Sequence, residues 1–210
     1  LDAYVEVAPE TLAVVRAARA RGKGIVLVFG HIGNWELTCR LSPEVQPNAA
    51  IAKRSWHPRL DAWAEAARAR TGVQTFWRDD RDTGRKILRL FREGGTLGLL
   101  IDQDIGGVQN VWVPFFGRPA ATPRGAAESA LRSGPAVLVL TCHRRPEGGH
   151  RLEVVEVPYD AGAPDHEAEV LRLTAACAAV QEEAIRRHPT EWVWMHQRWK
   201  TPPPHGSTTG

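Results

Sequence analysis

The sequence predicts an α/β fold, built on a mainly parallel mixed sheet that is flanked by helices. Residues 25–29 and 96–101 are continuous apolar runs without polar alternation, which is typical of strands buried on both faces of a parallel sheet. Stretches of helical periodicity separate such runs, as in repeated strand–helix units. Residues 137–143 and 151–157 flank a turn that contains two glycines, and they predict a hairpin, which adds an antiparallel portion to the sheet.

Helices and strands alternate through the first half of the chain. Pro9 stands at a first-turn position of a helix that Gly22 ends. Pro58 opens a second amphipathic helix, and Asp79 or Asp80 is predicted to cap a third. The predicted order is helix 9–21, strand 25–29, helix 34–41, strand 49–52, helix 58–71, strand 73–77, helix 79–92 and strand 96–101.

The second half begins with residues 102–122, which have no clear period and are rich in glycine and proline. We expect a long functional loop there, because structureless loops of this length are uncommon inside compact domains. Thr122 followed by Pro123 predicts the start of a helix that runs to about Arg132. The remaining predicted elements are the hairpin, a helix over 165–188 capped by Asp165, and a disordered tail over 202–210.

The composition is that of a globular chain with one substantial core: 210 residues, 43% of them hydrophobic and 24% charged. Its 27 basic residues are diluted by 24 acidic ones and no recognition motif is present, which argues against a nucleic-acid-binding protein. There is no run of about 18 apolar residues and no visible signal peptide. Because the chain begins at Leu1 and its one methionine is Met195, we expect a piece of a longer product.

The cysteines do not form a recognisable framework. Cys39, Cys142 and Cys177 are odd in number, and no two have the spacing Cys-x-x-Cys. We interpret them as reduced, mostly packed thiols and predict neither a disulfide frame nor a zinc site. We assign no metal-binding or catalytic role to His196, because no second ligand lies at metal-ligand spacing from it. The sequence predicts no metal and no cofactor.

The most informative stretch follows the first buried strand. Gly30 ends this strand, His31 follows directly, and Glu36 comes five positions later. On one regular helix the two side chains would point roughly 140° apart, but they converge if His31 lies in a turn and Glu36 in the first helical turn. That place is the carboxyl end of the strand, where open α/β sheets hold ligands. An imidazole oriented by a carboxylate can take a proton from a hydroxyl. The alternative is a capping histidine beside a glutamate that favours the helix dipole.

Three blocks of the sequence resemble one protein family. The block His31-Ile-Gly-Asn-Trp-Glu36, with the strand before it, resembles the His-x4-Asp/Glu motif of the lysophospholipid acyltransferase superfamily. Within that superfamily it is most similar to the lipid A biosynthesis (lauroyl/myristoyl) acyltransferases. Residues 102–119 resemble the second signature of this family, and residues 192–200 resemble its carboxyl-terminal one. Three blocks in order over most of the chain make a specific match, whereas His-x4-Glu alone would be weak.

The resemblance implies a glycerolipid acyltransferase-like fold over residues 1–201 and an O-acyltransferase that uses a thioester donor. His31 would be the general base that deprotonates a hydroxyl, and Glu36 would orient it. No Gly-x-Ser-x-Gly elbow is present, so direct transfer fits better than an acyl-enzyme. By its position relative to the family's arginine, Arg70, or else Arg68, is the candidate donor to the oxyanion. The alternative is a solvated arginine at a helix end.

Further candidate residues follow the strand predicted over 96–101. Asp102 and Asp104 stand at the same sheet edge as His31. A carboxylate there can hold Arg70 in place or bind the acceptor, and the alternative is a turn-forming aspartate. The resemblance favours Asp102 as a catalytic residue. The residues expected to bind substrate are Asn34, Trp35, Asp104, Phe115, Phe116 and Arg118.

Two apolar segments allow two interpretations each. Residues 113–117, which contain both phenylalanines, can line an acyl-chain channel or merely pack their loop onto the core. Residues 192–200 place three tryptophans among His196, Arg198 and Lys200, which suits a membrane interface. They also suit plain packing of a terminal segment, and we favour packing for the first two tryptophans.

From the resemblance we expect an enzyme that moves a fatty acyl chain from an acyl-carrier-protein thioester to a hydroxyl of a lipid A precursor. It would be peripheral to, or anchored on, the cytoplasmic face of the bacterial inner membrane, with the membrane surface as a partner. One alternative is acyl-CoA-dependent acylation of another glycolipid, such as a phosphatidylinositol mannoside. The other is a catalytically idle lipid-binding domain, against which the intact set His31, Glu36, Arg70 and Asp102 argues.

Overall fold

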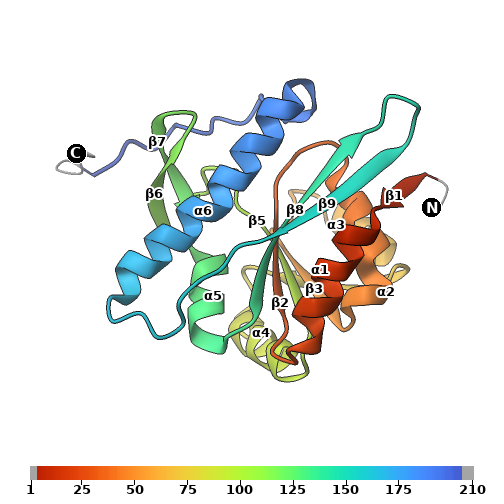
Figure 1. Cartoon of the computed structure of the whole chain (residues 1–210), viewed down its shortest axis with the longest axis horizontal. Helices are drawn as coiled ribbons and strands as arrows, with labels where there is room; N and C mark the ends of the chain where they lie inside the picture. The colour runs from red at the N-terminus through yellow and green to blue at the C-terminus, as the bar shows by residue number, and fades with distance from the viewer. Residues whose placement is uncertain (1–3, 205–210) are drawn as a thin grey trace.

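The computed structural model describes residues 4–204, which form a seven-stranded, mostly parallel sheet between helices (Figure 1). β8 and β9 pair antiparallel, whereas the other neighbouring strands of this sheet pair in parallel. The predicted α/β class and the predicted hairpin are therefore confirmed. In the order in which they pair, the strands are β1 (Val5–Val7), β9 (His150–Glu156), β8 (Ala136–Arg144), β2 (Ile25–Phe29), β5 (Thr96–Leu100), β3 (Asn48–Ala52) and β4 (Val73–Trp77).

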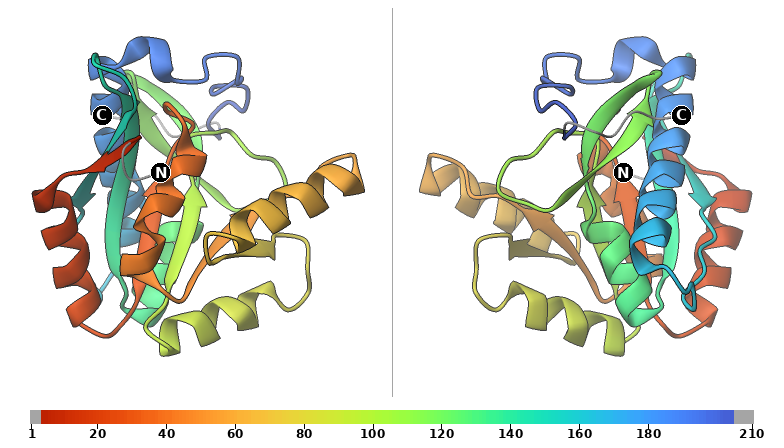
Figure 2. Two further views of the ribbon diagram at one scale, coloured as in Figure 1. Left: turned by 90° about the vertical axis from the view of Figure 1, so that its right-hand side faces the viewer. Right: turned by 90° about the vertical axis from the view of Figure 1, so that its left-hand side faces the viewer.

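The helices cover the two faces of the sheet in two groups (Figure 1). One group lies over the apolar cluster of one face and consists of α1 (Pro9–Ala20), the 3-10 helix η1 (Trp35–Leu41) and α2 (Ser42–Val45). The other group consists of α4 (Thr83–Arg92), α5 (Gly125–Ser133) and α6 (His166–Arg187). The remaining helix, α3 (Pro58–Ala69), packs along the edge strand β4 and projects from the body of the protein (Figure 2).

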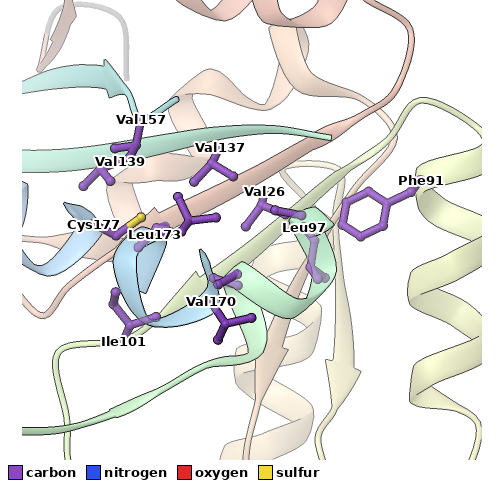
Figure 3. Packing of buried hydrophobic residues seen from close by; sticks show 14 of the residues in the cluster. Val26, Phe91, Leu97, Ile101, Val137, Val139, Val157, Val170, Leu173 and Cys177 are labelled. Atoms are coloured by element: carbon purple, nitrogen blue, oxygen red, sulfur yellow. The ribbon is translucent and has the colours of Figure 1, made fainter. Parts of the chain in front are cut away.

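The strand β2 shows why both faces of the sheet must be covered. All of its residues are buried, and alternate side chains join opposite apolar clusters. Val26 lies in the cluster beneath α5 and α6, together with Leu173 and Cys177 of α6 (Figure 3). Ile25 and Leu27 lie in the cluster beneath α1. Burying such a side chain contributes about 1.5–3 kcal/mol, so a run without polar alternation is stable in the middle layer.

The prediction of a structureless loop over 102–122 is wrong for its second half. There β6 (Asn110–Phe115) and β7 (Arg118–Pro123) form an antiparallel hairpin beside α6 (Figure 1). Pro114 and Pro119 pair across this hairpin, and prolines argue against strands in a sequence. They are tolerated because each strand of a two-stranded hairpin has a free edge, where a missing N–H costs no ladder hydrogen bond.

The hairpin also changes the start of the next helix. Thr122 and Pro123 end β7 instead of opening a helix, and α5 begins at Gly125. Both residues were misread as a cap and a first helical residue because their pairing with β6 is a long-range feature. By contrast, Asp165 caps α6 as predicted, since its side chain accepts a hydrogen bond of 3.0 Å from the amide of Ala168.

Two helix boundaries also differ from expectation. Residues 35–41 form a 3-10 helix, where the sequence predicted an α-helix over 34–41. The residue before α4 is Asp82, whereas Asp79 or Asp80 had been predicted to cap it. Both differences concern a helix that follows a loop. Tertiary contacts decide which of several neighbouring polar residues precedes the first turn, and helix ends are the least certain part of a sequence-based prediction.

The C-terminal segment returns to the sheet edge at which β2 ends. After α6 and the short 3-10 helix η2 (Pro189–Glu191), Trp192 forms an antiparallel bridge with Ile32. The amide of Val193 then donates a hydrogen bond of 3.1 Å to the carbonyl of His31. Two segments that are far apart in the sequence therefore lie side by side next to the predicted catalytic histidine.

Residues 205–210 lie outside the described residues, so most of the predicted tail over 202–210 is not described. The part up to Pro204 contains neither helix nor strand. Within the described chain, no helix is both long enough and apolar enough to cross a bilayer.

Candidate functional site

The candidate site forms where β2 and β5 end, at the carboxyl edge of the sheet. Phe29 of β2 pairs with Leu100 of β5, and two positions further along each segment stand His31 and Asp102. The register therefore brings these two side chains together at the edge where the sequence placed them. Gly30 permits the close approach, because a Cβ at its position would lie only 3.2 Å from the carboxylate carbon of Asp102.

Asp102 holds both the ring and the backbone of His31. Its Oδ1 lies 2.8 Å from Nδ1 of the imidazole, and its Oδ2 accepts hydrogen bonds from the His31 amide (2.7 Å) and from Trp192 Nε1 (2.9 Å). Burial raises the pKa of Asp102, but the hydrogen bonds and charge of His31, and the bond from Trp192, outweigh burial and hold the pKa below its usual value. The carboxylate is therefore ionised at neutral pH and fixes the imidazole tautomer with its proton on Nδ1.

The side-chain amide of Gln103 packs against the ring of His31. Its nitrogen lies 3.0 Å from both Nδ1 and Nε2 of His31 and 2.6 Å from Nε2 of His196. The two histidine ring centroids are 5.2 Å apart, and the ring of Trp35 packs edge-on against His31. Burial, and then the charge that His31 can carry, lower the pKa of His196, so this imidazole is neutral at pH 7.

Neither Gln103 nor His196 was predicted for the site. Gln103 directly follows Asp102, and His196 belongs to the carboxyl-terminal signature block, so each had a weak signal. Their approach to His31 depends on the return of the C-terminal segment to the end of β2, which no local pattern reveals. His196 therefore lies beside His31, and the expectation that it has neither a metal-binding nor a catalytic role stays a prediction.

The expected pairing of His31 with Glu36 is replaced by another contact. Nδ1 of His31 binds Asp102, while Glu36 accepts hydrogen bonds of 2.6 Å and 3.3 Å from the guanidinium of Arg68. The side chain of Glu36 is 53% exposed, because the 3-10 helix that starts at Trp35 turns this residue toward α3 instead of toward the ring. Glu36 thus connects η1 to the last turn of α3.

Arg70 does not contact Asp102, contrary to the expectation from the sequence. It is the exposed residue that ends α3, and it forms no ion pair within the part of the chain that the structure describes. Both oxygens of Asp102 are bound by His31 and Trp192 instead. Arg68 and Arg70 are the two candidate donors to the oxyanion. Of these two, it is Arg68 whose guanidinium is held in place, by the carboxylate of Glu36.

Two of the expected substrate-binding residues make structural contacts. Asp104 is buried and accepts hydrogen bonds from the amide and the hydroxyl of Thr201, at 2.8 Å and 3.0 Å. Phe115 is also buried, with ring contacts to Trp192 and Trp199. For both residues the structure favours packing and anchoring of the C-terminal segment over a direct place beside a substrate.

The other expected substrate-binding residues are less buried: Trp35 and Phe116 are half-buried, and Asn34 and Arg118 are exposed. Phe116 has a left-handed backbone (φ 51°), and its amide donates a hydrogen bond of 2.6 Å to Glu182. Arg118 is exposed and stacks over the ring of Trp199, 5.0 Å from its centroid. Asn34 is exposed directly before η1.

A buried arginine links the C-terminal segment to β7, and it interacts through charge with the loop after β5 that carries Asp102 and Asp104, which we call the site loop. Arg198 is 1% exposed, and it donates hydrogen bonds to the carbonyl of Ala121 and to the hydroxyl of Thr122, each 2.5 Å long. Burial lowers its pKa to about 10, while the negative charges of Asp102 and Asp104 oppose that change. Arg198 is therefore a buried cation at neutral pH, balanced by the two aspartates of the site loop.

The geometry of the site suits general-base chemistry, and the three cysteines do not offer a nucleophile. An ionised carboxylate on Nδ1 leaves Nε2 of His31 as a proton acceptor. The cysteines do not supply a thiolate, because burial raises the pKa of Cys142 to about 11 and that of Cys177 to about 12, and also raises the pKa of Cys39. The arrangement fits the removal of a proton from a bound hydroxyl.

Within the described residues, one group of side chains is close enough to hold a metal ion. It consists of Glu128, His166 and Glu167 at the ends of α5 and α6. The guanidinium of Arg124 already binds both carboxylates. This group is an ion-pair network on the surface and is separate from the His31 site.

The chain matches one protein family over nearly all of its length. The model of the bacterial lipid A biosynthesis acyltransferases matches residues 5–201. The lipid A biosynthesis lauroyltransferase of Escherichia coli (strain K12) is 28% identical over 192 residues, which cover 90% of this chain and 60% of that protein. The lipid A biosynthesis palmitoleoyltransferase of the same organism is 28% identical over 197 residues, which cover 92% and 61%.

A second kind of relative is similar over almost the same region. The phosphatidylinositol mannoside acyltransferase of Mycobacterium tuberculosis (strain CDC 1551 / Oshkosh) is 24% identical over 197 residues, which cover 87% of this chain and 57% of that protein. The chain thus spans about three fifths of the length of the curated relatives that it matches.

Proposed function

This chain belongs to the bacterial lipid A biosynthesis acyltransferase family, and on that basis we propose that it transfers a fatty acyl group from a thioester to a hydroxyl of a glycolipid. We propose residues 1–201 as the acyltransferase domain. The observation that carries the proposal is the buried carboxylate of Asp102 on Nδ1 of His31, at 2.8 Å, because this arrangement makes Nε2 a general base.

In the proposed reaction, Nε2 of His31 takes the proton of the acceptor hydroxyl while the hydroxyl oxygen attacks the thioester carbonyl carbon. Asp102 stabilises the resulting imidazolium through Nδ1. The tetrahedral intermediate then collapses, the carbon–sulfur bond breaks, and the imidazolium gives its proton to the departing thiolate. In this proposal the acceptor hydroxyl binds within hydrogen-bond distance of Nε2, next to the side-chain amide of Gln103.

The oxyanion of this intermediate requires a donor, and α3 supplies the candidates. Arg70 is the donor predicted from the family resemblance. Arg68 is the stronger candidate from the contacts, because Glu36 holds its guanidinium beside η1, the helix that also carries Trp35 against His31. In this proposal Glu36 acts as a positioning residue for Arg68, whereas Asp102 orients the base.

We propose an acyl-carrier-protein thioester as the donor, a lipid A precursor as the acceptor and the cytoplasmic face of the inner membrane as the place of reaction. The names of the relatives from Escherichia coli support this acceptor. A second candidate is acyl-CoA-dependent acylation of a phosphatidylinositol mannoside, which the similarity to the mycobacterial acyltransferase supports. A catalytically idle lipid-binding domain is disfavoured, because it would not need a buried ionised carboxylate to orient a histidine.

The test is to incubate the protein with each acceptor and each donor and to identify products by mass spectrometry. Acceptors are a lipid A precursor and a phosphatidylinositol mannoside, and donors are acyl-carrier-protein and CoA thioesters of several chain lengths. We expect a product one acyl group heavier, with a preference for the lipid A precursor and the carrier-protein thioester. Absence of acylation with every pair, by a folded protein, would contradict the proposal.

A further inference from the structure

The helix α3 presents its large apolar side chains to solvent instead of to the protein. It contains no buried residue, although it packs along β4. Leu60 is 52% and Trp63 is 68% exposed, and Trp56, just before the helix, is 85% exposed. The half-buried residues of α3 include the small Ala64 and Ala67. This distribution is the reverse of an ordinary surface helix, whose large apolar residues face the core.

The spacing places two of these side chains on one face of α3, because Trp63 follows Leu60 by three residues of the helix. Trp56 precedes the helix by two residues and is the most exposed of the three. Single exposed apolar residues are common and require no explanation. Two tryptophans more than 60% exposed and a half-exposed leucine within eight residues of sequence are more than isolated cases, and they indicate an interaction surface. We call Trp56, Leu60 and Trp63 the α3 patch.

Three exposed cations belong to the same segment of chain as the α3 patch. Lys53, Arg59 and Arg70 are exposed, and none of them has an ion-pair partner among residues 4–204. The two acids of this segment are Asp61, whose carboxylate accepts a hydrogen bond from the Ser55 amide, and Glu65 on α3. Tryptophan rings beside unpaired cations match the headgroup region of an anionic bilayer, where the ring body lies in apolar surroundings and the cations meet phosphates.

The start of α3 follows from the sheet edge that carries the candidate site. β3, which leads into α3, runs parallel to β5, and β5 runs parallel to β2, so the ends of β3 and β2 lie at one edge of the sheet. The ion pair between Arg68 and Glu36 ties the last turn of α3 to η1. α3 extends outward from the rest of the protein in both views of Figure 2, so a flat surface can reach it.

We propose that the α3 patch docks the protein on the headgroup layer of an anionic lipid bilayer. A second copy of the chain fits this surface less well. A two-fold interface brings the same patch of both copies together, and it would place Arg59 and its neighbouring cations against their own counterparts. An anionic lipid surface instead supplies the opposite charge at every point of contact. The docking itself does not depend on acyl transfer, although its benefit to the enzyme rests on the proposed lipid substrate.

The experiment measures binding of the protein to substrate-free vesicles of phosphatidylcholine with and without 30% phosphatidylglycerol, by co-sedimentation. In the variant Trp56→Ser/Trp63→Ser we expect the partition coefficient for the anionic vesicles to fall by about tenfold or more, since both rings leave the interface. The matched control is Leu171→Ser, which removes an exposed apolar side chain on α6 and should leave binding unchanged.

A second arm tests the charges. In Lys53→Glu/Arg59→Glu, binding to anionic vesicles should weaken and depend less on salt, while any binding to pure phosphatidylcholine should change little. A third arm needs no variant: lipids brominated near the headgroup should quench part of the tryptophan fluorescence of the unmodified chain. The quenching should shrink in Trp56→Phe and in Trp63→Phe, which keep an aromatic ring and preserve folding.

Several results would overturn this proposal. One is that the unmodified chain does not bind anionic vesicles. Another is that the double serine variant is folded by circular dichroism and binds as well as the unmodified chain. A third is that this variant loses only self-association. The last result would assign the patch to a second copy. Because substrate is absent from these measurements, their failure would leave acyl transfer untouched, and a failure of acyl transfer would leave docking untouched.

Discussion

At the residue scale, the sequence predicts that Glu36 orients His31 and that Asp102 holds Arg70 or binds the acceptor. The surroundings of the two carboxylates in the structure assign them other contacts. Asp102 is buried and hydrogen-bonded to the ring, whereas Glu36 is half exposed and binds Arg68. The sequence placed Asp102 and His31 at one sheet edge, because parallel strands end together. It did not reveal the contact between them, since the register of β2 with β5 is a long-range feature.

The first prediction concerns Asp102. Replacing its carboxylate in Asp102→Asn removes the charge that stabilises the imidazolium and lowers the preference for the productive tautomer. Turnover should fall by about 10²–10⁴-fold, the usual contribution of general-base catalysis. The measurement is the steady-state rate of acyl transfer, with the surface variant Asp82→Asn as the control. A folded Asp102→Asn protein with nearly normal turnover would remove Asp102 from the mechanism.

The second prediction concerns the pair formed by Glu36 and Arg68. If Glu36 acts by holding the guanidinium, then Glu36→Gln and Arg68→Ala should each slow transfer, and the double variant should lose less than the product of the two losses. Arg70→Ala combined with Glu36→Gln is the comparison, and its losses should multiply. Multiplying losses for the first pair would show that Glu36 works independently of Arg68.

At the scale of elements, the C-terminal segment is part of the site and not an appendix. Trp192 donates a hydrogen bond to Asp102, and Nε2 of His196 lies 2.6 Å from the amide nitrogen of Gln103. The positive charge of Arg198 balances the charges of Asp102 and Asp104. The tryptophans of this segment and its resemblance to a family signature indicated that it matters. A block of aromatic and basic residues does not predict, however, where in the fold the segment packs. The hairpin of β6 and β7 was missed for a related reason, because its prolines hide strand patterns whose pairing partner is distant.

The third prediction concerns the buried cation of this segment. Arg198→Ala leaves the carbonyl of Ala121 and two buried aspartates without their positive partner, and we expect the free energy of unfolding to fall by about 3–5 kcal/mol. Urea unfolding followed by circular dichroism measures this change. Arg186→Ala, which removes an exposed arginine of α6, is the control. A loss below that of the control would mean that the site loop does not depend on Arg198.

The fourth prediction concerns acid. Burial and the charge of the adjacent His188 lower the pKa of His143. Arg187 lowers this pKa further, and the acids Glu153 and Glu191 oppose the change. Burial and the charge of His31 lower the pKa of His196. Because both folded pKa values lie below the unfolded value of about 6.5, the unfolded chain takes up these protons first as pH falls. The free energy of unfolding should therefore decrease as pH drops below that value.

The measurement for the fourth prediction is thermal unfolding between pH 7.5 and pH 5. The variant His143→Gln/His196→Gln should show a flatter pH dependence than the unmodified chain, since it lacks the groups that resist protonation. His166→Gln, which replaces an exposed histidine, should keep the original slope. An unchanged slope in the double variant would assign the acid sensitivity to other groups.

At the scale of the whole molecule, the sequence predicted the architecture well and the site in part. Apolar runs buried on both faces, helical periods and turn residues are local signals, and they predicted β2, β4 and β5 and the hairpin of β8 and β9. The sequence also predicted that the site lies at the carboxyl ends of the strands, because parallel strands end at the same edge of the sheet. What the sequence did not predict is the set of contacts between distant segments: Glu36 with Arg68, and Gln103 with His196.

The central claim is that His31 is the base of an acyl transfer reaction. The most direct measurement is the rate at which His31→Ala transfers an acyl group to the best acceptor found for the unmodified chain, followed by mass spectrometry. The account predicts a loss of about 10²-fold or more, with the circular dichroism spectrum unchanged and His166→Ala fully active. A folded His31→Ala protein that transfers the acyl group at nearly the normal rate would contradict it.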